Sequence, residues 1–421
     1  MVNMGGFFSS ITIRQWTVLG VFNLMLVAAF GLLMRSMVIF PQTWLNQKFI
    51  LHAHSHFAFS GWISHMLMVL MTMVVLRREP GECLPKRYQL LLGANMLASY
   101  GMLFCFSWQG YGRYSIVFST LTILLSYVFV GMLWRAVGQA LLSPLVRKWF
   151  RAALVFLVLS SVGTFYLAYL QATHNVDGDK QLSAVYFFLH FQYNGWFFFA
   201  CMGLWHHWLA SHKIEVSGGT ILYRFFAWTC VPAYLLSLLW MDLPVWLYVI
   251  LGMAVVCQNV SWFYWVVGMV PGVKRGKGIQ PVWLRSVLLC VLLAVCLKLL
   301  LYVMALIPKF QPLTYSFRPI VIGYLHLVLL GIITLFILGF VFLNAVTRET
   351  PLTKWALISF IVGIVGNESL LLLEGLTGMQ GVYIPYIPLG LAVVALLLFL
   401  SIGLLWISIF LGRKNVEGAA G

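Results

Sequence analysis

Three histidines recur in one short signature at nearly equal intervals along the chain. The copies read His56-Phe-Ala-Phe-Ser-Gly61, His190-Phe-Gln-Tyr-Asn-Gly195 and His326-Leu-Val-Leu-Leu-Gly331. The histidines are 134 and 136 residues apart, and a glycine follows each by five positions. Neutral imidazole is the commonest metal ligand in proteins and an axial ligand of haem iron. The repeat therefore predicts a metal or haem site built by several copies of one structural unit.

The composition predicts that membrane helices carry these histidines. Of the 421 residues, 62% are hydrophobic and 9% are charged, and the mean hydropathy is +0.95. These values exclude a soluble globular domain. Apolar runs of the length that crosses a bilayer, about 20 residues, predict twelve spanning helices, with neither a soluble domain nor a cleavable signal peptide. The runs are 16–34, 50–76, 88–106, 114–134, 149–170, 183–209, 220–240, 245–271, 284–307, 319–344, 355–373 and 384–411.

The predicted fold class is an all-α integral membrane protein with twelve transmembrane helices in three four-helix pseudo-repeats. The pseudo-repeats cover residues 14–135, 147–272 and 282–411, within a single membrane domain at 1–411 that a short tail at 412–421 follows. Each signature histidine then lies in the second helix of its pseudo-repeat. Because each unit contains an even number of helices, all three copies have the same orientation.

The positive charges behind the net charge of +16 are divided unevenly between the two predicted sides of the membrane. If the N-terminus is cytoplasmic, nineteen lysines and arginines lie on the cytoplasmic side and six on the other. This positive-inside bias predicts a multi-pass protein of the cytoplasmic (inner) membrane with both termini in the cytoplasm. Membrane lipids with anionic headgroups are the expected partners of the basic residues, and nucleic acid is not.

The predicted topology places the three imidazoles at one depth. Each lies seven or eight residues inside the outer face, or about 10–12 Å at 1.5 Å per residue. A single histidine in a membrane helix often only hydrogen-bonds a neighbouring helix, but three at one depth favour a functional site. Gly61 and Gly331 would allow a flat ligand to approach closely. Arg318, at the start of its helix, is the cation we expect beside a haem propionate.

The second predicted helix contains further histidines. His52 and His56 are four residues apart and share a helix face, a spacing that chelates a metal, whereas His54 points away from both. Spacing alone leaves open which of the three binds a metal. The phase of the repeat favours His56.

Other ionisable residues give weaker signals. Lys298 and Glu368 fall in the outer half of apolar helices, where a mutual ion pair is the simplest expectation and proton transfer by Glu368 an alternative. His174, before Asp177, is expected in a turn rather than a surface metal site. His206 is expected near headgroups and loop carbonyls. The seven cysteines form neither a CxxC pair nor a CxxCH haem-attachment motif.

This layout resembles subunit I of the haem-copper oxidase superfamily, which has twelve helices in three arcs and histidines in helices 2, 6 and 10. The resemblance implies that His56 and His326 are the axial ligands of a low-spin haem. It also implies that His190 occupies the position of a copper ligand.

The chain departs from that family at the copper site. Its seventh predicted helix, 219–241, lacks the family's histidine pair, and Tyr324 replaces the first histidine of the family's His-x-His in helix 10. Asn194 stands where a tyrosine often follows the helix 6 histidine. The copper centre is therefore expected to be incomplete or absent. The His52-Ala-His54 run also resembles the NnrS family of haem- and copper-containing membrane proteins linked to nitric oxide stress.

Together these features predict a membrane protein that binds a b-type haem (heme b), with copper or another second metal as a further cofactor. The expected role is electron transfer or chemistry of NO or O2. If the chain is an enzyme, it is an oxidoreductase supplied with electrons by a partner subunit or a quinol. The alternatives are a secondary transporter or proton-coupled permease, and a scaffold or sensor subunit without cofactor. Helices uninterrupted near their histidines would favour the haem protein over a transporter.

Overall fold

The computed structural model describes residues 11–41, 44–275, 280–347 and 349–417, and nearly all of them are helical. An isolated β-bridge between Thr12 and Cys83 is the only β pairing within these ranges. The predicted all-α class is therefore confirmed. The helices are α2 (Ile13–Ile39), α3 (Gln47–Phe57), η1 (Ala58–Ser64), α4 (His65–Leu76), α5 (Lys86–Gln109), α6 (Arg113–Gln139), α7 (Pro144–Ala172), α8 (Gly178–His190), η2 (Phe191–Phe197), α9 (Phe198–Ser211), α10 (Gly219–Thr229), η3 (Pro232–Leu238), α11 (Val245–Arg275), α12 (Val282–Ala305), η4 (Gln311–Thr314), α13 (Arg318–His326), η5 (Leu327–Thr334), α14 (Leu335–Leu343), α15 (Pro351–Met379) and α16 (Ile387–Glu417).

Ten helices in the described residues are long and apolar enough to cross a membrane, and the bent pair α10–η3 would make an eleventh. This supports a multi-pass membrane protein but gives fewer spans than the twelve predicted. The remaining predicted span, 183–209, lies in the continuous helix formed by α8, η2 and α9. His190, Gln192 and Asn194 make the middle of that helix polar, which explains why it is less apolar than the others.

Each signature histidine is followed, within two residues, by a π-helical segment. Helix η1 begins two residues after His56, η2 one residue after His190, and η5 one residue after His326. The signature glycines lie inside these segments. The helices therefore continue past their histidines, but with a changed backbone hydrogen-bond pattern, which differs from the uninterrupted helices expected from the sequence. Such π-bulges are rare and are often found at functional sites.

Contacts divide the chain into two compact units. Unit 1 contains Met1–Met132 and Ile337–Gly421, and unit 2 contains Leu133–Phe336. The division does not follow the three predicted pseudo-repeats, because unit 2 contains all of the second predicted pseudo-repeat and the beginning of the third. Both unit boundaries fall within helices, α6 and α14.

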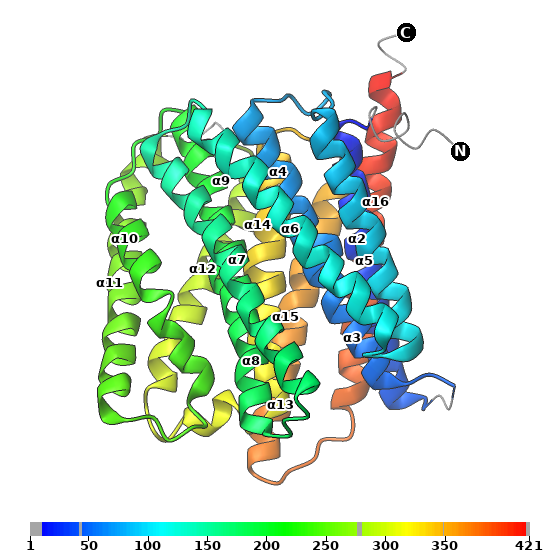
Figure 1. Cartoon of the computed structure of the whole chain (residues 1–421). Helices are drawn as coiled ribbons and strands as arrows, with labels where there is room; N and C mark the ends of the chain where they lie inside the picture. Colours follow the sequence, from blue (N-terminus) through cyan, green and yellow to red (C-terminus); the bar gives the residue numbers. More distant parts are fainter. Residues whose placement is uncertain (1–10, 42–43, 276–279, 348, 418–421) are drawn as a thin grey trace. The chain divides into compact units, whose positions relative to one another are not determined.

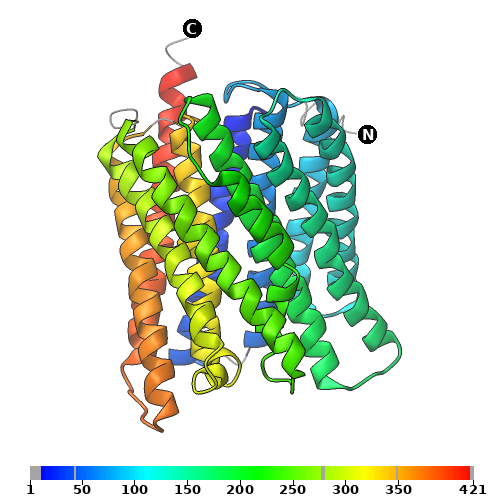
Figure 2. The same cartoon turned by 90° about the vertical axis from the view of Figure 1, so that its left-hand side faces the viewer.

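In unit 1, α16 packs against α15 and α2, and α3 packs against α5 and α2. Figures 1 and 2 show α15, in orange, running antiparallel to α16, in red. The π-helical segment η1 is tied to α2 by a side chain, because the Asn23 amide donates a 2.6 Å hydrogen bond to the carbonyl of Gly61. Tyr100 on α5 in turn donates to the Asn23 carbonyl oxygen.

In unit 2, α7 packs against α8, η2 and α9, while α12 packs against η5 and α11 (Figure 1). The two π-helical segments η2 and η5 also contact each other. Helices α7 and α8 approach closely at Gly163. A Cβ atom at this position would lie 2.5 Å from the Ala184 carbonyl oxygen and 2.8 Å from the Phe188 nitrogen.

Replacing Gly163 with alanine is expected to destabilise the protein by about 1–3 kcal/mol, because the methyl group would force two backbones apart. Gly252→Ala is the matched control, since nothing lies within 4 Å of a Cβ atom there. Alanine at a helix position is favoured over glycine by up to about 1 kcal/mol, so the control should be neutral or stabilising. Denaturant unfolding in detergent measures both. Equal stability of the two variants would contradict the close packing of α7 on α8.

Candidate functional site

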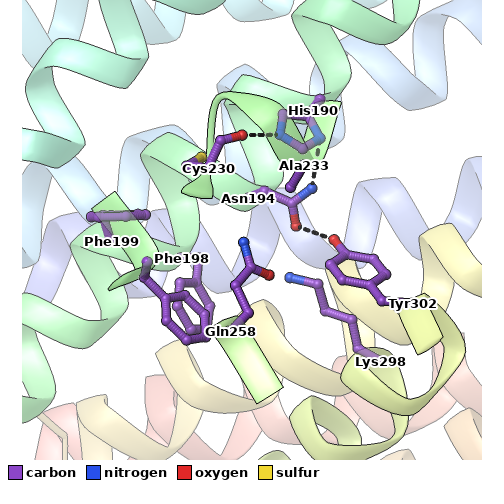
Figure 3. Close-up of a pocket in the computed structure, with 10 residues that line it drawn as sticks. His190, Asn194, Phe198, Phe199, Cys230, Ala233, Gln258, Lys298 and Tyr302 are labelled. Atoms are coloured by element: carbon purple, nitrogen blue, oxygen red, sulfur yellow. Dashed lines mark hydrogen bonds between the residues drawn. The ribbon is translucent and has the colours of Figure 1, made fainter. Parts of the chain in front are cut away.

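The hydrogen-bonding groups of His190 are all engaged inside unit 2. This side chain ends α8 and is only 2% exposed. Its Nε2 lies 2.8 Å from the carbonyl oxygen of Cys230, which can only accept, so Nε2–H is the donor. The Asn194 amide, one turn later in η2, donates to His190 Nδ1 over 3.1 Å (Figure 3). These partners fix the neutral imidazole with its proton on Nε2.

A chain of polar side chains extends from His190 through Asn194 to two tyrosines. Tyr302, on α12, donates to the Asn194 carbonyl oxygen over 3.0 Å. The hydroxyl of Tyr324, on α13, lies 3.0 Å from that of Tyr302. Because Tyr302 already uses its proton on Asn194, Tyr324 is the donor of this last bond. The continuous helix of α8 and η2 is thus joined to α12 and α13 by one series of hydrogen bonds.

Lys298 lies one turn before Tyr302 on α12 and is 4% exposed. Its ammonium lies 5.1 Å from the centre of the Phe198 ring and 5.5 Å from that of Tyr302, which are cation–π distances. In Figure 3 the side chains of Lys298 and Gln258 point toward each other. Among the described residues of unit 2, no carboxylate forms an ion pair with Lys298.

The predicted partner of Lys298, Glu368, belongs to unit 1. Its carboxylate accepts a hydrogen bond of 3.2 Å from the neighbouring Asn367 amide on α15. An ion pair between Lys298 and Glu368 would join the two units, and it stays a prediction.

A cavity lies next to these hydrogen-bonded side chains. Its volume of about 10 Å³ is room for about one water molecule. Its lining is mixed, with polar groups on one side and phenylalanine rings on the other. The residues that line it are His190, Asn194, Phe198, Phe199, Phe226, Cys230, Ala233, Gln258, Lys298 and Tyr302.

These hydrogen bonds bear on the predicted copper ligand. Both ring nitrogens of His190 are bonded to protein groups, so a metal would have to displace either Asn194 or the Cys230 carbonyl. Within the described parts of the chain, no three or more His, Cys, Asp or Glu side chains are grouped to hold a metal ion. Copper at His190 therefore stays a prediction.

In unit 1, His54 has the hydrogen bonding of a metal-ligating histidine. Its Nδ1 lies 3.0 Å from the carbonyl oxygen of Val27 on α2, so Nδ1–H is the donor. The Nε2 lone pair then remains for a metal. The imidazole packs beside Gly31, where a Cβ atom would lie at an ordinary contact distance of 3.5 Å, so this packing does not require a glycine.

His56 and His52 lie on the other face of α3, next to Phe106 and Tyr111. The His56 ring stacks on Phe106 with centroids 4.3 Å apart, and His56 Nε2 is hydrogen-bonded to the Tyr111 hydroxyl over 3.0 Å. His52 meets Tyr111 edge to face at 4.5 Å. Its Nε2 is buried and has no hydrogen-bond partner in the structure. To bind iron through Nε2, His56 would first have to release Tyr111.

The other predicted haem-site residues lie on the helix formed by α13 and η5. His326 ends α13 and is half-buried, Gly331 is buried within η5, and Arg318 is the exposed first residue of α13. His326 belongs to unit 2 and His56 to unit 1. Their pairing across a haem stays a prediction.

Two weaker expectations have clear outcomes. His206 is buried between the rings of Trp149 and Trp265, with centroids 5.7 and 5.8 Å away, so the expected headgroup location is wrong. His174 lies in a turn after α7, as expected, whereas Asp177 and Gly178 do not form a turn but begin α8, with Asp177 as its N-cap. A hydrogen bond from Lys180, together with its charge, lowers the pKa of Asp177.

The sequence analysis missed Tyr302 and Gln258 in unit 2 and Tyr111 in unit 1. One signal was present for Tyr302, because it follows the unusual Lys298 by four residues and must share its helix face. Gln258 and Tyr111 reach their sites only through packing of helices, and no spacing in the sequence indicates it.

Asn194→Leu is expected to destabilise the protein by about 1–3 kcal/mol, because His190 Nδ1 and the Tyr302 hydroxyl stay buried but lose their hydrogen bonds to the Asn194 amide. Asn344→Leu is the control, since Asn344 bonds only a carbonyl of its own helix turn. Denaturant unfolding in detergent compares the two. If Asn194→Leu is no less stable than the control, the hydrogen bonds from His190 through Asn194 to Tyr302 do not contribute to the stability of the fold.

No protein-family model matches this chain, and no curated protein is significantly similar to it.

Proposed function

We propose that this chain is a haem protein of the cytoplasmic membrane that holds a b-type haem between histidines of α3 and of the α13–η5 helix. The observation that carries the proposal is the π-helical segment beside each of the three signature histidines. A rare backbone feature at three equivalent positions supports three pseudo-repeats and, with them, the resemblance to haem-copper oxidase subunit I. It also supports a functional role for these positions.

The hydrogen bonds of α3 favour His54 as the ligand on this helix, although the repeat phase favours His56. Histidines that bind metals usually donate their other ring N–H to a carbonyl or carboxylate, which fixes the ring and raises its basicity. His54 has such a bond, to Val27. His56 instead uses Nε2 on Tyr111. His326 is the proposed second ligand.

A haem bound in this way would supply one-electron transfer, or would bind a diatomic gas such as NO or O2 if one ligand were displaced. The chain's own residues would position the group. The exposed guanidinium of Arg318 would pair with a propionate. The Phe57 ring already fills the space beside Gly61, where a Cβ atom would lie 2.5 Å from it, so Gly331 is the glycine that would allow close packing. Electrons would come from a partner subunit or a quinol.

A reduced-minus-oxidised optical spectrum of the detergent-purified protein tests the proposal. We expect the sharp bands of a low-spin b-type haem in the wild type and in His56→Ala. They should be lost in His54→Ala and His326→Ala, because each removes an axial ligand. His174→Ala, in a loop, is the control.

Loss of the bands in His56→Ala and their retention in His54→Ala would instead assign the ligand to His56. A colourless wild-type protein, produced with haem supplied during expression, would overturn the haem proposal.

The second candidate function is a proton-coupled transporter, supported by the hydrogen-bonded chain from Tyr324 to His190. Hydrogen-bonded ionisable groups within a membrane are typical of proton relays. Here protons would pass between the hydroxyls of Tyr324 and Tyr302. The Asn194 amide, which is not a proton-transfer group, would hold Tyr302 and His190 in place.

For this candidate, Tyr302→Phe is expected to slow proton uptake into proteoliposomes about tenfold, a barrier increase of about 1.4 kcal/mol, because it removes the central hydroxyl. Tyr248→Phe is the control, since the hydroxyl of Tyr248 is hydrogen-bonded to the Leu306 carbonyl and to Gln311, which are not part of the proposed relay. A pH-sensitive dye follows the uptake. Equal rates in both variants would exclude a proton relay through Tyr302.

A further inference from the structure

The ammonium group of Lys298 lies next to a polar cavity and has no ion-pair partner among the described residues of unit 2. The side chain is 4% exposed and lines the cavity together with Asn194, Gln258 and Cys230. No hydrogen bond or ion pair of Lys298 is formed within the described part of unit 2. A buried charge in a membrane protein is costly and usually serves a function.

The groups around the cavity favour an anion. Asn194 uses one amide N–H on His190, and Gln258 uses one on the Thr229 hydroxyl. Each amide therefore retains a second N–H, and the Cys230 thiol is a further weak donor. The faces of Phe198 and Tyr302 stabilise the charged form of the lysine, since ring faces attract cations. The lining therefore contains a cation and several donors but no carboxylate, and its acceptor on the side of Lys298 is the Gln258 carbonyl oxygen (Figure 3).

We propose that the cavity beside Lys298 binds one small monovalent anion of halide size. The charge of the lysine sets the sign of the ligand. The volume of about 10 Å³ is that of one water molecule, so a halide would replace that water with a small outward shift of the phenylalanine side, whereas sulfate or phosphate would need a much larger rearrangement. This site does not depend on the proposed haem, because all its residues belong to unit 2 and none is a proposed haem ligand.

Equilibrium binding of radiolabelled chloride to the full-length protein in detergent tests the site. Ionic strength is kept constant with gluconate, which is too large for the cavity. We expect one saturable chloride per chain in the wild type and in Lys309→Met, the control that removes an exposed lysine of unit 2. In Lys298→Met the affinity should fall by at least about tenfold, because the neutral side chain supplies no charge.

Competition on the wild type tests the same site without a variant. Bromide should displace the bound chloride, whereas sulfate at the same ionic strength should not. Two results would overturn the proposal: no saturable chloride in the wild type, as expected if a neutral lysine faces one water molecule, or equal binding by Lys298→Met and the wild type. Displacement by sulfate would also overturn it, since the ion would then lie outside the cavity.

Discussion

The fold depends on the need of every polar backbone group in an apolar environment to find a partner within the protein. Regular helices satisfy this need by themselves, which is why helices dominate the described residues. The three π-helical segments depart from the regular pattern, and at η1 a side chain supports the altered backbone. Asn23 donates to the carbonyl of Gly61 and is itself held by Tyr100. The contact of α2, α5 and η1 therefore includes polar bonds as well as apolar packing.

The same constraint explains the side chains around His190. Its two ring nitrogens, Asn194 and Tyr302 form a chain in which each group gives or receives a defined bond. Such a fully bonded network can be buried at modest free-energy cost and helps to specify one arrangement of its helices. Lys298 is the contrasting case, because it is equally buried but forms no hydrogen bond or ion pair within the described part of unit 2, where two ring faces lie at cation–π distance from its ammonium. The difference separates a structural network from a candidate binding site.

Two histidine-bearing helices with one sequence signature have different hydrogen bonding. His190 carries its proton on Nε2 and gives it to a carbonyl, so its ring is committed to the protein. His54 carries its proton on Nδ1, which leaves Nε2 for a ligand. His54 precedes the signature position of its helix by two residues. The histidine at the signature position, His56, contacts Phe106 and Tyr111 instead. Helices with the same histidine signature thus differ in which imidazole has a ring nitrogen left for a ligand.

Hydropathy by itself predicted an all-helical, multi-pass chain, and the run at 16–34 lies within α2 (Ile13–Ile39). The sequence also identified His190 and Lys298, because ionisable residues stand out in apolar helices. It did not predict the π-helical segments, since a change of backbone hydrogen bonding leaves no mark in residue spacing. Nor did it predict the His190–Cys230 and Asn194–Tyr302 bonds, which join residues 40 and 108 positions apart. Only the packing of distant helices decides which polar groups meet and where a cavity remains.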